Sequence, residues 1–227
     1  MKDGGTLTGR VHPAGFGDVN LCDRERVPQP ILRTARLLMV PLADRHLERE
    51  IELDADPEVH RFLTGRTRTP DEVVSSHQRL LAAAERVDGL GHWAAFCSDG
   101  GARHPTAPGH EDGGDFVGIM MLPPADGSTV TVAELGYRLM RRFWRQGLAT
   151  EASRGLLRHA FETAGQERVI AQTMTVNTGS RGVMRAAGLR YVRTFFPLFD
   201  DPLPGTELGE VEYEMTREMW RAHHTPA

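Results

Sequence analysis

The chain has 227 residues, 40% of them hydrophobic, which is enough to bury one good core. Its formal net charge of −4 argues against a nucleic-acid-binding protein, because such proteins usually carry an excess of basic residues. No apolar run approaches the roughly 20 residues that span a bilayer, and residues 1–10 lack the apolar core of a signal peptide. We therefore expect a cytoplasmic protein that does not enter a membrane.

The cysteines and histidines indicate neither a disulfide framework nor a metal site. Cys22 and Cys97 are the only cysteines, the first in an expected leader and the second in an expected strand. The histidines show no ligand spacing such as His-Glu-x-x-His. We expect no bound metal.

A single domain is expected over residues 31–222, between a flexible leader (1–30) and a short tail (223–227). Segment 98–115 is rich in glycine and polar residues, which predicts a mobile surface loop. The apolar patterns predict strands over 31–41, 92–97, 116–122, 130–140, 169–176, 189–196 and 210–216. They predict two short helices, one through 47–53 and one through 59–63, that are separated by residues 54–57, and further helices over 70–88, from 148 onward and over 180–187. This order predicts an α/β fold with a mixed sheet.

Three helix ends carry local signals. Thr69-Pro70-Asp71-Glu72 combines an N-cap, a proline at the first helical position and the acidic residue of a capping box. Asp44 is expected to cap the first helix, and Gly188 is expected to end the helix that precedes it.

The turn at Gly147 joins the strand 130–140 to a long helix. A helix N-terminus offers unpaired N–H groups and a positive dipole, and small residues at Gly147 and Ala149 let an anion approach. Four arginines lie nearby, at positions 138, 141, 142 and 145. The turn alone indicates either a phosphate site or an ordinary strand-to-helix turn with solvated arginines.

Two segments together resemble the GNAT superfamily of acyl-CoA-dependent N-acetyltransferases, and its RimJ/RimL-type branch in particular. The first runs from Glu134 to Ala152 and contains Trp144-Arg-Gln-Gly-Leu-Ala149, which is similar to the motif that holds the CoA pyrophosphate. The second runs from Asn177 to Leu189. The resemblance implies a mostly antiparallel central sheet of about seven strands flanked by helices, whose splayed central strands bind acyl-CoA.

The resemblance also implies site residues. Contacts to acetyl-CoA are expected from Leu139, Met140, Arg145, Gln146, Gly147, Leu148, Ala149, Thr150, Asn177 and Ser180. Asn177 could instead be a turn former, and Ser180 a helix cap.

Amine acetylation needs a base for the ammonium and a proton donor for the thiolate. Glu134 is the candidate base, although it could instead pair with an arginine. Ser180 is the candidate acid, because the tyrosine that many members of the superfamily use is replaced here by Met184. Strict alternation points Tyr137 away from Glu134, which favours a core role for it.

The sequence therefore predicts an N-acetyltransferase that moves an acetyl group from acetyl-CoA to a primary amine by direct attack in a ternary complex. The acceptor is either a protein N-terminus or a small molecule, and the enzyme is a monomer or homodimer. Loss of the tyrosine at Met184 leaves one alternative, a non-catalytic acyl-CoA-binding module.

Overall fold

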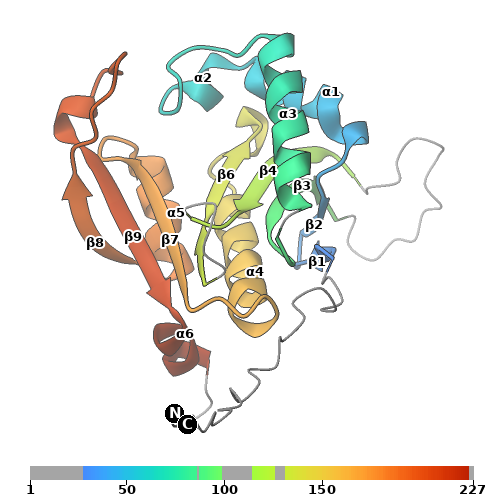
Figure 1. Cartoon of the computed structure of the whole chain (residues 1–227), viewed down its shortest axis with the longest axis vertical. Helices are drawn as coiled ribbons and strands as arrows, with labels where there is room; N and C mark the ends of the chain where they lie inside the picture. Colours follow the sequence, from blue (N-terminus) through green and yellow to red (C-terminus); the bar gives the residue numbers. More distant parts are fainter. Residues whose placement is uncertain (1–27, 86, 99–113, 126–130, 225–227) are drawn as a thin grey trace, which may run out of the picture.

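The structure is a computed structural model that describes residues 28–85, 87–98, 114–125 and 131–224 (Figure 1). Most of the predicted leader, loop 98–115 and tail lie outside these residues. The first sheet has the order β1-β2-β3-β4-β6, and the second has the order β5-β7-β9-β8. All strand pairs are antiparallel except β5 with β7. The predicted mixed and mostly antiparallel α/β fold is confirmed.

The strands are β1 (Leu32–Arg33), β2 (Leu37–Pro41), β3 (Gly91–Cys97), β4 (Phe116–Leu122), β5 (Val132–Glu134), β6 (Gly136–Leu139), β7 (Arg168–Met174), β8 (Arg190–Phe195) and β9 (Glu210–Thr216). The α-helices are α1 (Leu47–Asp54), α2 (Pro57–His60), α3 (Pro70–Ala84), α4 (Leu148–Glu162), α5 (Thr178–Ala187) and α6 (Arg217–His224). Short 3-10 turns are η2 (Asp44–His46), η3 (Arg141–Phe143) and η4 (Thr206–Leu208).

The predicted strand 130–140 is two strands in two different sheets, so that prediction was wrong. Residues up to Glu134 pair with β7, and the N–H of Leu135 still donates to the carbonyl of Ile170 at 2.8 Å. From Gly136 the chain pairs with β4 instead. The side chains nevertheless alternate without interruption, because Ala133, Leu135 and Leu139 all belong to one buried cluster. The segment is extended throughout and only its partner strand changes. Nothing in the sequence of the segment indicates this change.

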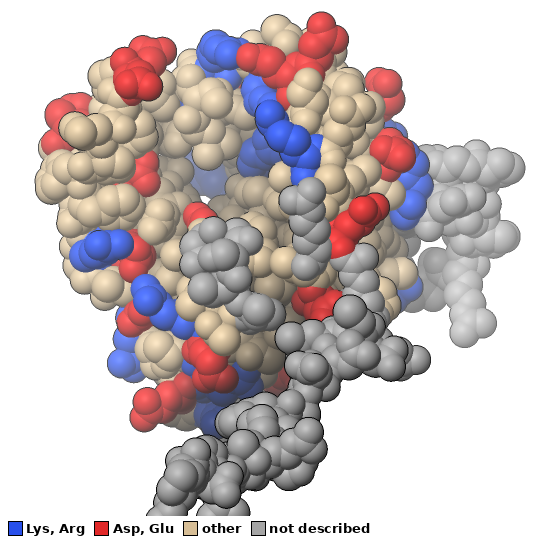
Figure 2. Space-filling model, in the orientation of Figure 1, with Lys and Arg blue, Asp and Glu red and all other residues tan. Residues whose placement is uncertain are grey.

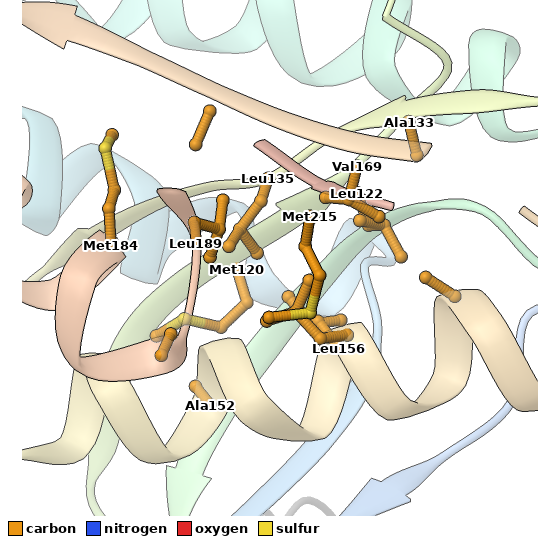
Figure 3. Packing of buried hydrophobic residues seen from close by; sticks show 14 of the residues in the cluster. Met120, Leu122, Ala133, Leu135, Ala152, Leu156, Val169, Met184, Leu189 and Met215 are labelled. Atoms are coloured by element: carbon orange, nitrogen blue, oxygen red, sulfur yellow. The ribbon is translucent and has the colours of Figure 1, made fainter. Parts of the chain in front are cut away.

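The main core lies between the two sheets and helices α4 and α5 (Figure 3). Leu156 from α4, Met184 from α5, Leu122 from β4 and Met215 from β9 are all buried and converge in this cluster. Burying one such side chain contributes about 1.5–3 kcal/mol. A second cluster lies on the opposite face of the first sheet, under α1 and α3.

Two of the three local signals placed a helix end correctly. Thr69 and Glu72 form the predicted capping box of α3, and Gly188 ends α5 with φ 98°. Asp44 is not a cap: it begins the 3-10 turn, and the cap position falls on Ala43. Helix α6 was not predicted. It has only eight residues, and a helix this short depends on packing against the rest of the chain, here the stacking of Trp220 on Phe161.

Candidate active site

The two sheets part beside Glu134, where two strand edges no longer pair with each other, and we call the space between these two edges of backbone the slot. Beyond the fork, β6 pairs only with β4, and residues 171–174 of β7 pair only with β9 (Figure 1). Such edges carry backbone N–H and C=O groups that can pair with an extended ligand containing amides. One of these groups is already used, since Trp144 Nε1 donates to the carbonyl of Leu139 at 2.8 Å.

The turn at Gly147 has a backbone geometry that is compatible with a bound anion. Gly147 has φ 78° and Arg145 has φ 61°, and Arg145 is the only non-glycine residue with positive φ in the described part of the chain. The first hydrogen bond of α4 runs from Glu151 N–H to Gly147 O, so the N–H groups of residues 148–150 have no partner within the helix. No side chain caps this terminus. These N–H groups are therefore available to a phosphate.

A clamp from the first β-hairpin fixes this turn. Glu151 accepts hydrogen bonds from Thr34 Oγ1 at 2.6 Å, from Arg36 N at 2.7 Å and from Arg36 Nε at 2.6 Å. Arg36 Nη1 also donates to the carbonyl of Gln146 at 3.0 Å. Burial opposes the charge on Glu151, but the bonds from Thr34 and Arg36 outweigh it and lower its pKa. No sequence motif marks Arg36, because its partner Glu151 lies 115 positions away.

The arginine cluster does not gather at the turn as predicted. Arg138 points to the opposite sheet face and bonds Asp54 at 2.8 Å, Arg141 lies 3.3 Å from Asp56, and Arg142 lies 3.5 Å from Glu52. Of the four, only Arg145 lacks an acidic partner among the described residues. In Figure 2 basic and acidic side chains are interspersed on the face shown, with no broad basic field.

Glu134 lies at the fork, on the sheet face that also carries Glu210 and Glu212. Its carboxylate is half-buried and makes no hydrogen bond or ion pair with the rest of the described chain, so it is not paired with an arginine there. Burial raises its pKa above the ordinary value, and the charges of Glu210 and Glu212 raise it further. A half-buried, unpaired carboxylate of raised pKa has the properties of a general base.

The same face holds a buried ionic cluster that the sequence did not predict. Asp54, which is fully buried, contacts Arg138, Arg68 at 3.2 Å and His60 at 3.1 Å. Burial lowers the pKa of His92 to about 4, and the nearby charge of Arg138 lowers it too. His92 is therefore neutral at pH 7. Its Nδ1 has no hydrogen-bond partner among the described residues.

The first turn of α5 faces β6. Asn177 Oδ1 accepts the N–H of Ser180 at 3.2 Å and its Nδ2 donates to Thr173 at 3.0 Å, so Asn177, not Ser180, caps this helix. The hydroxyl of Ser180 instead lies 2.9 Å from the hydroxyl of Tyr137. Met184 is 2% exposed within the core. The predicted acid Ser180 is thus coupled to a phenol that alternation alone had assigned to the core.

Comparisons with known proteins agree with this geometry. A family model described as an acetyltransferase (GNAT) domain matches residues 36–190. The chain is 40% identical over 206 residues to the FsC-acetyl coenzyme A-N(2)-transacetylase of Aspergillus fumigatus, covering 88% of this chain and 81% of that protein. The chain belongs to the GNAT acetyltransferase family.

Solved GNAT structures share its fold. The spermidine N-acetyltransferase of Vibrio cholerae, in complex with CoA and spermine, aligns with TM-score 0.63 over 81% of this chain and 97% of its own, at 9% identity. The ribosomal-protein acetyltransferase RimL, in complex with coenzyme A, aligns with TM-score 0.62 over 84% and 99% of the two chains, at 16% identity. At these identities the likeness concerns the fold.

Acetyl-CoA is the acetyl donor of this GNAT enzyme, and an amine is its acceptor. The residues present fit the donor, since the free N–H groups after Gly147 suit a pyrophosphate and the two strand edges suit an amide-containing chain. No helix among the described ranges is long and apolar enough to cross a membrane. Within those ranges, no three His, Cys, Asp or Glu side chains are grouped to hold a metal.

Proposed function

We propose that this enzyme acetylates the primary amine of a small, cationic molecule, with Glu134 as the base. The observation that carries the proposal is the unpaired carboxylate of Glu134 at the fork, with a pKa raised by burial and by Glu210 and Glu212. An ammonium group is attracted to such a face, and its proton has an acceptor there. The amine then attacks the acetyl carbonyl directly in a ternary complex.

The enclosure of this face supports a small acceptor. The connection between β8 and β9 reaches across to the segment after α2, where Leu203 packs on Gly65 so closely that a Cβ there would lie 2.3 Å from Leu203 Cδ2. Gly205 of the same connection packs on Val176, two residues after the end of β7. Figure 2 shows the surface hollowed between the β7–β9 side and the α1–α3 side. A hollow bridged in this way suits a compact acceptor better than an extended polypeptide.

The relative from Aspergillus fumigatus supports the same choice, because its name assigns the acetyl group to a nitrogen designated N(2), and it matches most of both chains. The RimJ/RimL-type resemblance rests on the donor-binding motifs, and RimL itself shares the fold at 16% identity. We infer that the likeness to that branch extends to the donor site and not to the acceptor.

The test is acetyl-CoA-dependent thiol release by the full chain with two sets of acceptors. One set contains amino-acid amides and alkyl diamines, and the other contains peptides with a free N-terminus and acetylated lysines. We expect the best small amine to exceed every peptide by at least about tenfold in kcat/KM. Peptides that are turned over faster than all small amines would overturn the assignment of the acceptor.

A further inference from the structure

Tyr137 and Glu134 lie on the same extended segment but on opposite faces of the sheet. Tyr137 packs with the core cluster on the side of α4 and α5, whereas Glu134 shares its face with Glu210 and Glu212. Next to Tyr137 the sheet is interrupted by the slot, because β6 pairs with β4 and residues 171–174 of β7 pair with β9. A thioester held in the slot would therefore have a carboxylate on one side and a phenol on the other.

The side chain of Tyr137, on β6, places its hydroxyl against the first turn of α5. It donates to the backbone carbonyl of Ser180 at 3.1 Å and lies 2.9 Å from Ser180 Oγ. Either hydroxyl can be the donor in this pair, so the serine hydroxyl can donate to the phenol oxygen whenever the phenol proton is directed to another acceptor. This arrangement holds the phenol in place and supplies a hydrogen bond to its oxygen if the proton leaves.

Breaking a thioester requires a proton donor for the sulfur, and α5 lacks one where it packs in the core. Met184 is buried and carries no acidic proton. Ser180 alone is a weak acid whose hydroxyl already faces Tyr137. Tyr137 is therefore the strongest proton donor that the structure places at this side of the slot.

We propose that Tyr137 protonates the sulfur that leaves acetyl-CoA, with Ser180 as the positioning residue for its hydroxyl. The ammonium loses one proton to Glu134, which passes it to solvent water, and the neutral amine nitrogen then forms the C–N bond to the acetyl carbon. Glu134 accepts the second proton from this nitrogen once the bond has formed. The C–S bond breaks, the sulfur keeps the electron pair, and the phenol proton moves to the sulfur. The phenolate is stabilised by the Ser180 hydroxyl and regains a proton from solvent water, to which Glu134 returns the proton it accepted.

The environment of Tyr137 keeps its phenol protonated. Burial raises the pKa of Tyr137 to about 12, although the bond to Ser180 opposes the shift. The phenol therefore keeps its proton throughout the pH range in which an amine is a nucleophile, and its donor capacity does not titrate there.

This inference rests on the proposed acetyl transfer but not on the identity of the acceptor, so it is tested with whichever amine the chain acetylates fastest. We expect Tyr137→Phe to lower kcat with acetyl-CoA about 100-fold while the KM for acetyl-CoA changes less than about threefold. Ser180→Ala should lower kcat less. Tyr191→Phe is the matched control, because it removes an exposed phenol whose partner is Thr194 on β8. This control should act like the wild type.

A second donor separates proton donation from a structural role. The leaving group of 4-nitrophenyl acetate departs without a proton, so Tyr137→Phe should use this donor within about twofold of the wild-type rate. An equal loss with both donors would show that the phenol only holds the fold. No loss with acetyl-CoA would remove it from the reaction.

A binding measurement makes the test independent of turnover. The chain has three tyrosines, so labelling their ζ carbons with 13C gives three NMR signals, and Tyr137→Phe identifies one of them. Saturation with CoA should shift the Tyr137 signal more than the other two. A Tyr137 signal that does not move when CoA binds would overturn the proposed contact with the sulfur, even if every acceptor proved wrong.

Discussion

At the scale of single residues, Glu134 gives the sharpest test of the chemistry. Glu134→Gln keeps the shape of the side chain but removes the base, so kcat/KM should fall about 100-fold or more. Burial and the neighbouring carboxylates raise the pKa of Glu134 above its ordinary value of 4.5. The wild-type rate should therefore increase with pH, and the midpoint of that increase should lie above pH 4.5. That limb of the pH profile should disappear in the variant. A profile that keeps its limb would assign the base elsewhere, with neutral His92 on the same face as the next candidate.

Stability changes in the opposite sense at the same position. The folded chain holds the Glu134 proton more tightly than the unfolded chain does, so this group costs stability as pH rises past its unfolded pKa. Glu134→Gln removes that cost and should leave the melting temperature at pH 7.5 unchanged or higher. A lower melting temperature would mean that the activity loss reflects damage to the fold.

These residues also mark how far sequence reasoning reaches. Glu134 and the turn at Gly147 could be proposed as site residues from the sequence because both lie in one contiguous segment, 134–152. The hydrogen bond between Tyr137 and Ser180 and the clamp of Arg36 on Glu151 could not, since each depends on how distant strands diverge or pair. Alternation of side chains predicted the correct face for Tyr137, but it does not indicate the hydrogen-bond partner of the Tyr137 hydroxyl.

At the scale of an element, the N-terminus of α4 depends on one glycine. Gly147 has φ 78°, so an alanine there is strained by about 1 kcal/mol, although its Cβ would only touch Arg36 Nη2 at 3.5 Å. Relief of that strain should turn the N–H groups away from the phosphate. We expect Gly147→Ala to raise the KM for acetyl-CoA about tenfold and to change kcat less, as measured by initial rates at saturating acceptor.

Gly182 offers a matched control within α5. Its φ is negative and a Cβ added there would have no neighbour within 4 Å, so Gly182→Ala should stabilise the chain by about 0.5–1 kcal/mol and leave the KM for acetyl-CoA unchanged. Helices such as α3 follow equally local rules, which is why its capping box was predicted from four residues. The division of residues 132–139 between two sheets follows no local rule.

At the scale of the whole molecule, buried histidines set the response to acid. The pKa of His92 is about 4 in the folded chain, and burial also lowers that of His159, despite its bond to the carbonyl of Gly89. The unfolded chain therefore binds more protons than the folded chain below about pH 6.5, and stability should fall as pH drops from 6.5 towards 4.

His92 alone can account for a loss on the order of 3 kcal/mol over this range. Urea unfolding at pH 4.5 to 7.5 should show a shallower decline for His92→Gln than for the wild type. His223→Gln is the control, since His223 is exposed on α6. If the two variants declined equally, the acid sensitivity would have to come from another group.

Because the two sheets part, backbone groups on the facing edges of β6 and β7 have no strand partner, and bound acetyl-CoA would supply hydrogen bonds that the free enzyme lacks. The extended segment 132–139 passes from the second sheet to the first, and residues 123–125 hydrogen-bond to its first part. A donor lying along both edges would cross-link the sheets beyond this point, where β6 and β7 do not pair. CoA at 100 times its Kd should then stabilise the fold by about 2.7 kcal/mol. Hydrogen exchange should slow most at residues 136–140 and 171–174. Binding of the acetyl donor should thus stabilise the connection between the two sheets as well as supply the acetyl group.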